Sequence, residues 1–239
     1  MIKFLIQTID GEVKHDFSFA LIESLRYQAW ADKTSPFMYT YMDTNGLRLN
    51  QFKPIYSDYI PVGSVEFVSD FLFQFFGKIP LPINIPAELM SEDFTHRHVK
   101  NGTELDIVQK SFVKSNDKIK SFTEICDHAP IGNYQISDII EIESEWRAFV
   151  YNGELVGLQN YSGSFTEFPN VYLIKVMINA YKSAPIAYTL DVAITKGGWT
   201  SVIEAHDFFS CGLYGFADHK ILPFMFSRWY QEYIRNLPF

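Results

Sequence analysis

The sequence predicts an α+β protein in which a small α/β domain precedes a larger domain built from short strands and hairpins. Apolar runs typical of strands alternate with helical patterns over roughly the first 90 residues. Further along, short β-branched runs flank two turn dipeptides, Asn152-Gly153 and Gly197-Gly198. A proline-rich stretch at residues 79–86 separates the two patterns. We therefore expect a first domain of residues 1–88 and a second of residues 89–239.

The first domain is expected to alternate strands and helices. Ser64 suits the N-cap of its second helix, and Gly77 suits the end of that helix. The expected elements are a strand at residues 3–8, a helix at 17–30, a strand at 37–42, a strand from Ile60 to the Gly63-Ser64 turn, and a helix at 65–76.

The second domain is expected to contain mostly strands, with two helices near its end. Asn152-Gly153 is the best short hairpin signal in the chain. The expected elements are a strand at residues 111–115, a polar loop at 116–118, a strand from about Ile119, a strand at 136–142, a hairpin of 145–150 with 154–158, a helix at 170–182, the strand pair within 188–207, and a closing amphipathic helix at 223–235.

The strand pair around Gly197-Gly198 carries the strongest indication of chemistry. A two-residue turn there pairs Asp191 with Glu204 and Thr189 with His206, and the period of two puts all four side chains on one face. Two opposed carboxylates repel each other unless something neutralises them. A divalent cation does so, and oxygen ligands of this kind suit Mg²⁺.

Two other interpretations of this hairpin stay open. The acids can form a solvated polar face without a ligand, and a three-residue loop would shift the register by one residue and separate them. Against the first, both strands are mostly apolar, and buried carboxylates without a partner are rare. The apolar residues are Leu190, Val192, Ile194, Val202 and Ile203.

Composition narrows the class of protein. The 239 residues are 47% hydrophobic with a formal net charge of -8, which argues against a nonspecific nucleic-acid binder but not against nucleotide binding. Cys126 and Cys211 make neither a disulfide framework nor a metal-type spacing, so we expect a reducing cytosol. No apolar run reaches the ~18 residues that cross a bilayer, and no signal peptide is visible. We expect a soluble cytoplasmic protein without a membrane partner.

The order of these elements resembles the ATP-grasp superfamily over about residues 95–216. That family pairs an acid on one strand with Glu-x-Asn on the next, and here these are Asp191 and Glu204-Ala205-His206. Ile139-Ile140-Glu141-Ile142 looks like the hinge strand beside adenine, and Phe112-Val113-Lys114 resembles the phosphate-binding lysine strand. Glu145-Trp146-Arg147 sits where several members carry an acid-x-Arg signature. The resemblance implies a two-sheet nucleotide-binding fold after a small α/β domain.

The resemblance also assigns the candidate site. It implies ATP held by Lys114, Glu141, Ile142 and Arg147, with Lys114 and Arg147 as the catalytic cations. Mg²⁺ would be held by three ligands, Asp191, Glu204 and His206.

Three features depart from the family pattern. His206 replaces the usual Asn, Thr189 replaces an arginine found in some members, and the loop after Lys114 lacks glycines. The segments at residues 61–67 and 212–215 are similar to a clade of phage and bacterial amidoligases.

The implied activity is an ATP- and Mg²⁺-dependent ligation of a carboxylate to an amine through an acyl-phosphate, with no covalent enzyme nucleophile. The acidic surface and the many Tyr and Phe of the first domain point to a peptide or protein acceptor. Two alternatives remain: a nucleotide-binding protein that has lost catalysis, and a kinase that stops at phosphoryl transfer.

Single candidates also have purely structural interpretations. Lys114 can be a surface lysine, Arg147 can pair with Glu145 or Glu141, and His206 can be a hydrogen-bonded core histidine.

Overall fold

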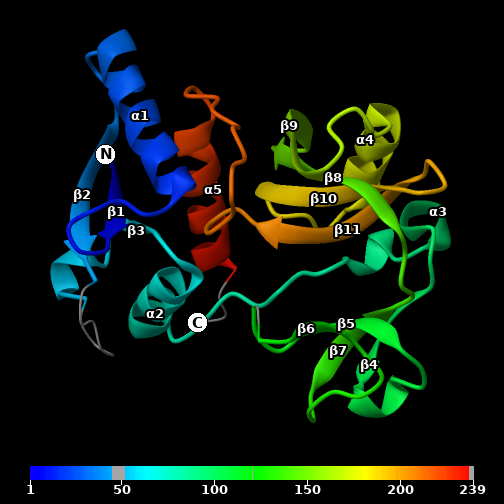
Figure 1. The fold of residues 1–239 in the computed structure, drawn as a ribbon. Coiled ribbons are helices and arrows are strands. Elements are labelled where there is room, and N and C mark those ends of the chain that lie inside the picture. Colours follow the sequence, from blue (N-terminus) through cyan, green and yellow to red (C-terminus); the bar gives the residue numbers. More distant parts are fainter. Residues whose placement is uncertain (45–51, 120, 237–239) are drawn as a thin grey trace. The chain divides into compact units, whose positions relative to one another are not determined.

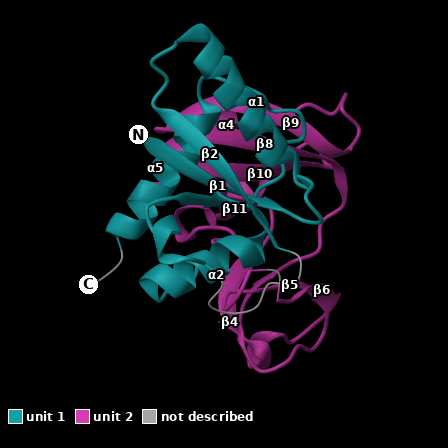
Figure 2. Ribbon diagram, turned by 90° about the vertical axis from the view of Figure 1, so that its left-hand side faces the viewer, with its two compact units in different colours: residues 1–80, 185–187, 207–239 teal, residues 81–184, 188–206 magenta. Residues whose placement is uncertain are grey.

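The structure is a computed structural model in which residues 1–44, 52–119 and 121–236 are described (Figure 1). The chain folds into two compact units (Figure 2). Unit 1 combines residues 1–80 and 185–187 with the segment from residue 207 onward, and unit 2 comprises residues 81–184 and 188–206. This division differs from the expected one in two respects: the first break lies at residue 80, and the C-terminal segment joins the N-terminal unit.

Unit 1 contains a three-stranded sheet in the order β2-β1-β3, and its strands pair in parallel. The central strand contains three successive residues without exposed surface, Phe4, Leu5 and Ile6, as expected of a parallel strand covered on both faces. Its elements are β1 (Ile2–Thr8), α1 (Asp16–Ala31), β2 (Phe37–Asp43), β3 (Ile60–Val62), α2 (Val65–Phe76) and α5 (Leu222–Arg235), with a 3-10 turn at Pro54–Tyr56.

The predicted elements of the first 80 residues are confirmed. The Ser64 hydroxyl accepts a hydrogen bond from the Phe67 amide at 3.2 Å, so it caps α2 as predicted. Gly77 ends that helix with φ +69°, a conformation that glycine adopts without cost. The predicted C-terminal helix is confirmed as α5, and within unit 1 its Trp229 indole donates to Asp207 at 2.8 Å.

Unit 2 contains two four-stranded sheets, ordered β4-β7-β5-β6 and β11-β10-β8-β9. The elements of the first sheet and the segment before it are α3 (Glu92–Thr95), β4 (Val99–Thr103), β5 (Ser111–Ser115), β6 (Thr123–Cys126) and β7 (Asn133–Ser137), with 3-10 turns at Ala87–Leu89 and Glu104–Asp106. Those of the second are β8 (Ile142–Tyr151), β9 (Glu154–Gly163), α4 (Val171–Ala180), β10 (Ala187–Thr195) and β11 (Thr200–Asp207).

The second sheet of unit 2 packs one face against α4. Residues at alternate positions of β8 and β10 point into this core, which fixes the opposite face for residues between them. Asn170 caps the helix by accepting from the Leu173 amide at 3.2 Å, although α4 ends two residues before the predicted limit of 182. The core residues of the two strands are Trp146, Ala148, Val150, Tyr188, Leu190 and Val192.

The predicted Asn152-Gly153 hairpin is confirmed. Asn152 and Gly153 have φ of 52° and 75°, and a type I′ turn requires positive φ at both central residues. It joins β8 to β9.

Two predicted strands are placed differently. The strand at residues 136–142 is wrong, because β7 ends at Ser137 and β8 begins at Ile142. The residues between them connect one sheet to the other and are mostly exposed, so they pair within neither. The strand expected from Ile119 begins at Thr123. Among the described residues, no helix is both long and apolar enough to cross a membrane.

Candidate functional site

The hairpin of β10 and β11 differs in its turn from the prediction. The Gly198 amide donates to the Thr195 carbonyl at 2.7 Å, and the Thr195 amide donates to the Trp199 carbonyl at 3.0 Å. These bonds close a three-residue loop in which Gly198 has φ +79°. The predicted two-residue turn is therefore wrong, and strict alternation from it would set Ile203, not Glu204, opposite Asp191.

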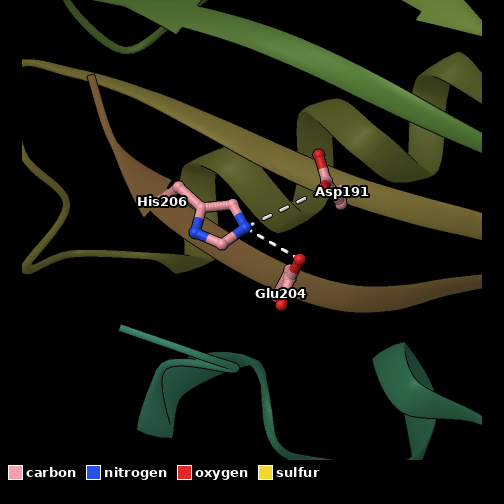
Figure 3. Close-up of side chains that lie close together, drawn as sticks. All are labelled: Asp191, Glu204 and His206. Atoms are coloured by element: carbon pink, nitrogen blue, oxygen red, sulfur yellow. Dashed lines mark ion pairs between the residues drawn. The ribbon is translucent and has the colours of Figure 1, made fainter. Parts of the chain in front are cut away.

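Asp191, Glu204 and His206 nevertheless come together (Figure 3). One possible ligand atom from each lies within 4.8 Å of the others. The reason lies in β11, where Val202 and Ala205 both belong to the core although they are three positions apart. Alternation is broken between them by one residue, as in a β-bulge, and this returns Glu204 and His206 to the face of Asp191.

Arg147 holds Asp191 from the neighbouring strand β8. Its Nε and Nη2 donate to Asp191 Oδ1 and Oδ2 at 2.8 and 2.7 Å, which is a bidentate, charge-assisted pair. The two residues are 6% and 1% exposed. The guanidinium also lies 5.7 Å from the ring centroid of Tyr161. Arg147 is thus a buried residue of the site face, and the carboxylate that it grips is the candidate metal ligand.

Lys114 approaches the same cluster from the other sheet of unit 2. It lies on β5 with 9% of its surface exposed, and its ammonium group donates to Glu204 Oε2. The interpretation of Lys114 as a surface lysine is therefore wrong. One side chain from each sheet meets here, so the site lies where the two sheets of unit 2 face each other.

The charges around Glu204 favour its ionised form. His206 Nε2 lies 2.8 Å from Glu204 Oε1 and 4.0 Å from Asp191 Oδ2. Burial favours the neutral carboxyl, but the charge and hydrogen bond of His206, followed by those of Lys114, outweigh burial and hold the pKa of Glu204 below its usual range. An anionic Glu204 can bind a cation.

Thr189 shares the site face but has no hydrogen-bond partner among the described residues. It lies two positions before Asp191 on β10, has no exposed surface, and its hydroxyl is unsatisfied. A buried hydroxyl without a partner costs free energy. This group is therefore available to a polar atom of a bound molecule.

Glu141 and Ile142 lie away from the cluster, at the connection between the two sheets. Glu141 forms an exposed ion pair with Lys196 at 2.6 Å, and its carbonyl accepts from the Lys196 amide. An open hollow of about 430 Å³ adjoins this segment. Its lining residues are His96, Ile140, Glu141, Thr195, Lys196, Gly197 and Trp199.

Sequence reasoning missed two residues that shape the site. Tyr161 on β9 covers Arg147 and donates to Glu145 Oε1 at 3.3 Å, and burial, more than any other cause, raises the pKa of Glu145. Asn84 joins the two sheets, because its carbonyl accepts from the Ala205 amide at 2.6 Å and its side chain donates to the Ser115 carbonyl at 3.0 Å. Neither residue belongs to a motif, and their partners are far away in the sequence.

Two carboxylates and an imidazole converge here within reach of one divalent cation, with a lysine and an arginine beside them. This arrangement suits a phosphate chain, whose oxygens bind both metal ions and such side chains. The assignment of each residue to metal or nucleotide stays a prediction.

Comparisons with known proteins agree with this geometry. A family model for an ATP-grasp domain, the second family of its clade, matches residues 94–223, which is more than half of the chain. No curated protein sequence matches the chain.

Several solved structures are similar over nearly the full length. D-cycloserine synthetase DcsG has a TM-score of 0.57 at 12% identity, covering 97% of this chain and 99% of that one. D-alanine–D-alanine ligase from Bacillus anthracis complexed with ATP has a TM-score of 0.51 at 10% identity, covering all of both chains. The ATP-grasp ligase PsnB complexed with minimal precursor has a TM-score of 0.52 at 9% identity, covering 95% and 99%. At such identities the likeness shows the fold, and the predicted α+β fold of the ATP-grasp type is confirmed.

Proposed function

This chain belongs to the ATP-grasp superfamily and is an ATP-dependent ligase that forms C–N bonds, and we propose that it joins a carboxylate to an amine through an acyl-phosphate. The observation that carries the proposal is the meeting of Lys114 and Arg147 with Asp191, Glu204 and His206 at one place between the two sheets. The narrower relationship to amidoligases stays a prediction.

The proposed roles follow from charge and position. Lys114 binds phosphate oxygens as a point charge, a role that suits its compact ammonium group. Arg147 presents a planar fork that suits the transferring phosphoryl group or a substrate carboxylate, and Asp191 fixes its orientation. Glu141 and Ile142, at the connection between the sheets, are proposed to line the adenine site.

The carboxylates of Asp191 and Glu204 fit a divalent cation such as Mg²⁺, and His206 adds a third ligand atom. When bound, such a cation offsets the negative charge of the phosphate oxygens during phosphoryl transfer.

The proposed reaction has two steps. An oxygen of the substrate carboxylate attacks the γ-phosphorus of ATP, the bond to the β-phosphate oxygen breaks, and ADP leaves. The nitrogen of the amine then attacks the carbonyl carbon of the acyl-phosphate, inorganic phosphate leaves, and the amine loses a proton. The chain contributes positioning and charge in both steps, with Lys114 and Arg147 holding the oxygens that carry the charge. No side chain forms a covalent bond.

The test is ADP release from the purified protein with Mg²⁺ and ATP, supplied with pools of amino acids and peptides. A ligase requires both an acid and an amine for turnover, and Lys114→Ala should raise the ATP concentration needed for half-maximal rate. ADP release with a single acceptor and no amide product would instead identify a kinase. Binding of ATP without turnover in every mixture would indicate a protein that has lost catalysis, which the replacements at His206 and Thr189 keep in view.

A further inference from the structure

The three candidate metal ligands do not make the all-oxygen set that Mg²⁺ prefers. Asp191 and Glu204 offer carboxylate oxygens, but His206 presents its Nε2 to both of them, at 4.0 and 2.8 Å (Figure 3). Ligand atoms about 2.1 Å from one octahedral ion lie roughly 3 to 4 Å from one another. The nitrogen of His206 is thus placed as a ligand, with no large movement needed.

Resting on the proposed function, we propose that this site binds Mn²⁺ more tightly than Mg²⁺ and that His206 is the residue responsible. Mg²⁺ demands oxygen ligands in near-ideal octahedral geometry and gives up its water reluctantly. Imidazole suits first-row transition ions, while carboxylates suit Mn²⁺ as well as Mg²⁺. Mn²⁺ therefore accommodates both the two carboxylates and the imidazole, together with phosphate oxygens.

The charges of the site show when this ion binds. Arg147 and Lys114 already balance the two carboxylates, so the cluster with a neutral imidazole carries no net charge. A divalent cation entering alone would leave two uncompensated positive charges in a largely buried place, which is costly. Phosphate oxygens supply the missing negative charge. The metal and the nucleotide consequently bind together, and the unsatisfied hydroxyl of Thr189 on the same face is a further polar group available to them.

The experiment follows Mn²⁺ by electron paramagnetic resonance in the complex of the full-length chain with ADP. Uniformly ¹⁵N-labelled ADP separates the nitrogens of the base from the ¹⁴N of the protein. The wild type should show ¹⁴N coupled to Mn²⁺, and His206→Asn should abolish this coupling by replacing the imidazole with an amide oxygen. Competition with Mg²⁺ gives the ratio of the two affinities, and we expect His206→Asn to lower the preference for Mn²⁺ by about tenfold or more, since even changes behind a ligand cost 10–100-fold.

His128→Asn is the matched control, because His128 is an exposed histidine beside Asp127 on the surface of the same unit. It should leave both the coupling and the affinity ratio unchanged. Absence of ¹⁴N coupling in the wild type, with equal affinity for the two metals, would overturn this inference and leave the ligase proposal standing. Failure of the wild type to bind ADP with either metal would overturn the ligase proposal as well. The wild-type coupling decides the matter without relying on the folding of a variant.

Discussion

At the scale of single residues, the site is defined by two ion pairs that differ in burial. Arg147 and Asp191 are almost wholly inside, whereas Lys114 and Glu204 lie closer to the surface. A buried ion pair adds little stability as a whole, but removing one partner leaves a buried charge without its counter-charge. The residues of the site are therefore also part of what holds the second sheet together.

Replacing Asp191 by Asn should destabilise the protein by about 3–5 kcal/mol, because Arg147 loses its carboxylate partner in a buried place. The free energy of unfolding in urea measures this loss. Glu141→Gln is the control, since its pair with Lys196 has both side chains about 70% exposed and such pairs contribute roughly 0–1 kcal/mol. Equal losses in the two variants would contradict the assignment of Arg147–Asp191 as a buried pair.

Glu204 should make stability depend on pH in acid. Because its pKa is held below the usual range in the folded chain, its contribution is present above about pH 4.3, the ordinary value for Glu, and is lost as pH falls further. The free energy of unfolding should therefore fall less steeply below this pH in Glu204→Gln than in the wild type. Glu124→Gln, which changes an exposed acid on β6, should keep the wild-type slope; an unchanged slope in both variants would refute the effect.

At the scale of elements, the hairpin shows what could be predicted from the sequence. The glycines and β-branched runs located β10, β11 and their turn, and the acids were named correctly as neighbours. The loop length was wrong by one residue, and the bulge that compensates for it was not predicted. Its position is hidden because Val202 and Ile203 are both apolar, so that the pattern alone does not show where alternation breaks.

Gly198→Ala should destabilise the protein by about 1–2 kcal/mol, because Gly198 has φ +79° and a Cβ disfavours this conformation. Urea unfolding again gives the value. Gly197→Ala is the neighbouring control: its φ is not positive, and an added Cβ meets first the side chain of the exposed Trp199, at 3.0 Å. A larger loss in the control than in Gly198→Ala would mean that the turn has a different conformation.

At the scale of the whole chain, the site depends on contacts between distant segments. Lys114 and Glu204 are 90 positions apart, and Asn84 links the segment before α3 to both β5 and β11. Such partners leave no periodic pattern, so the sequence alone did not predict them. The family resemblance supplied the grouping of the candidate residues, whereas the placement of α5 in the N-terminal unit came only from the structure.

Nucleotide and metal together should stabilise the folded chain. With a non-hydrolysable ATP analogue and a divalent cation at about 100 times the dissociation constant, mass action adds about 2.7 kcal/mol and raises the melting temperature. Removing the cation with EDTA should reverse most of this shift, because the phosphates then lack the charge that offsets Asp191 and Glu204. A shift that persists unchanged in EDTA would separate nucleotide binding from the metal ligands.

The most direct measurement of the central claim is the calorimetric affinity of the chain for an ATP analogue, with and without a divalent cation. The wild type should bind the analogue only weakly without the cation and much more tightly with it, and Glu204→Gln should lose most of that gain while staying folded. No binding by the wild type, or the same gain in Glu204→Gln, would contradict the claim that Asp191, Glu204 and His206 hold the metal of a nucleotide site.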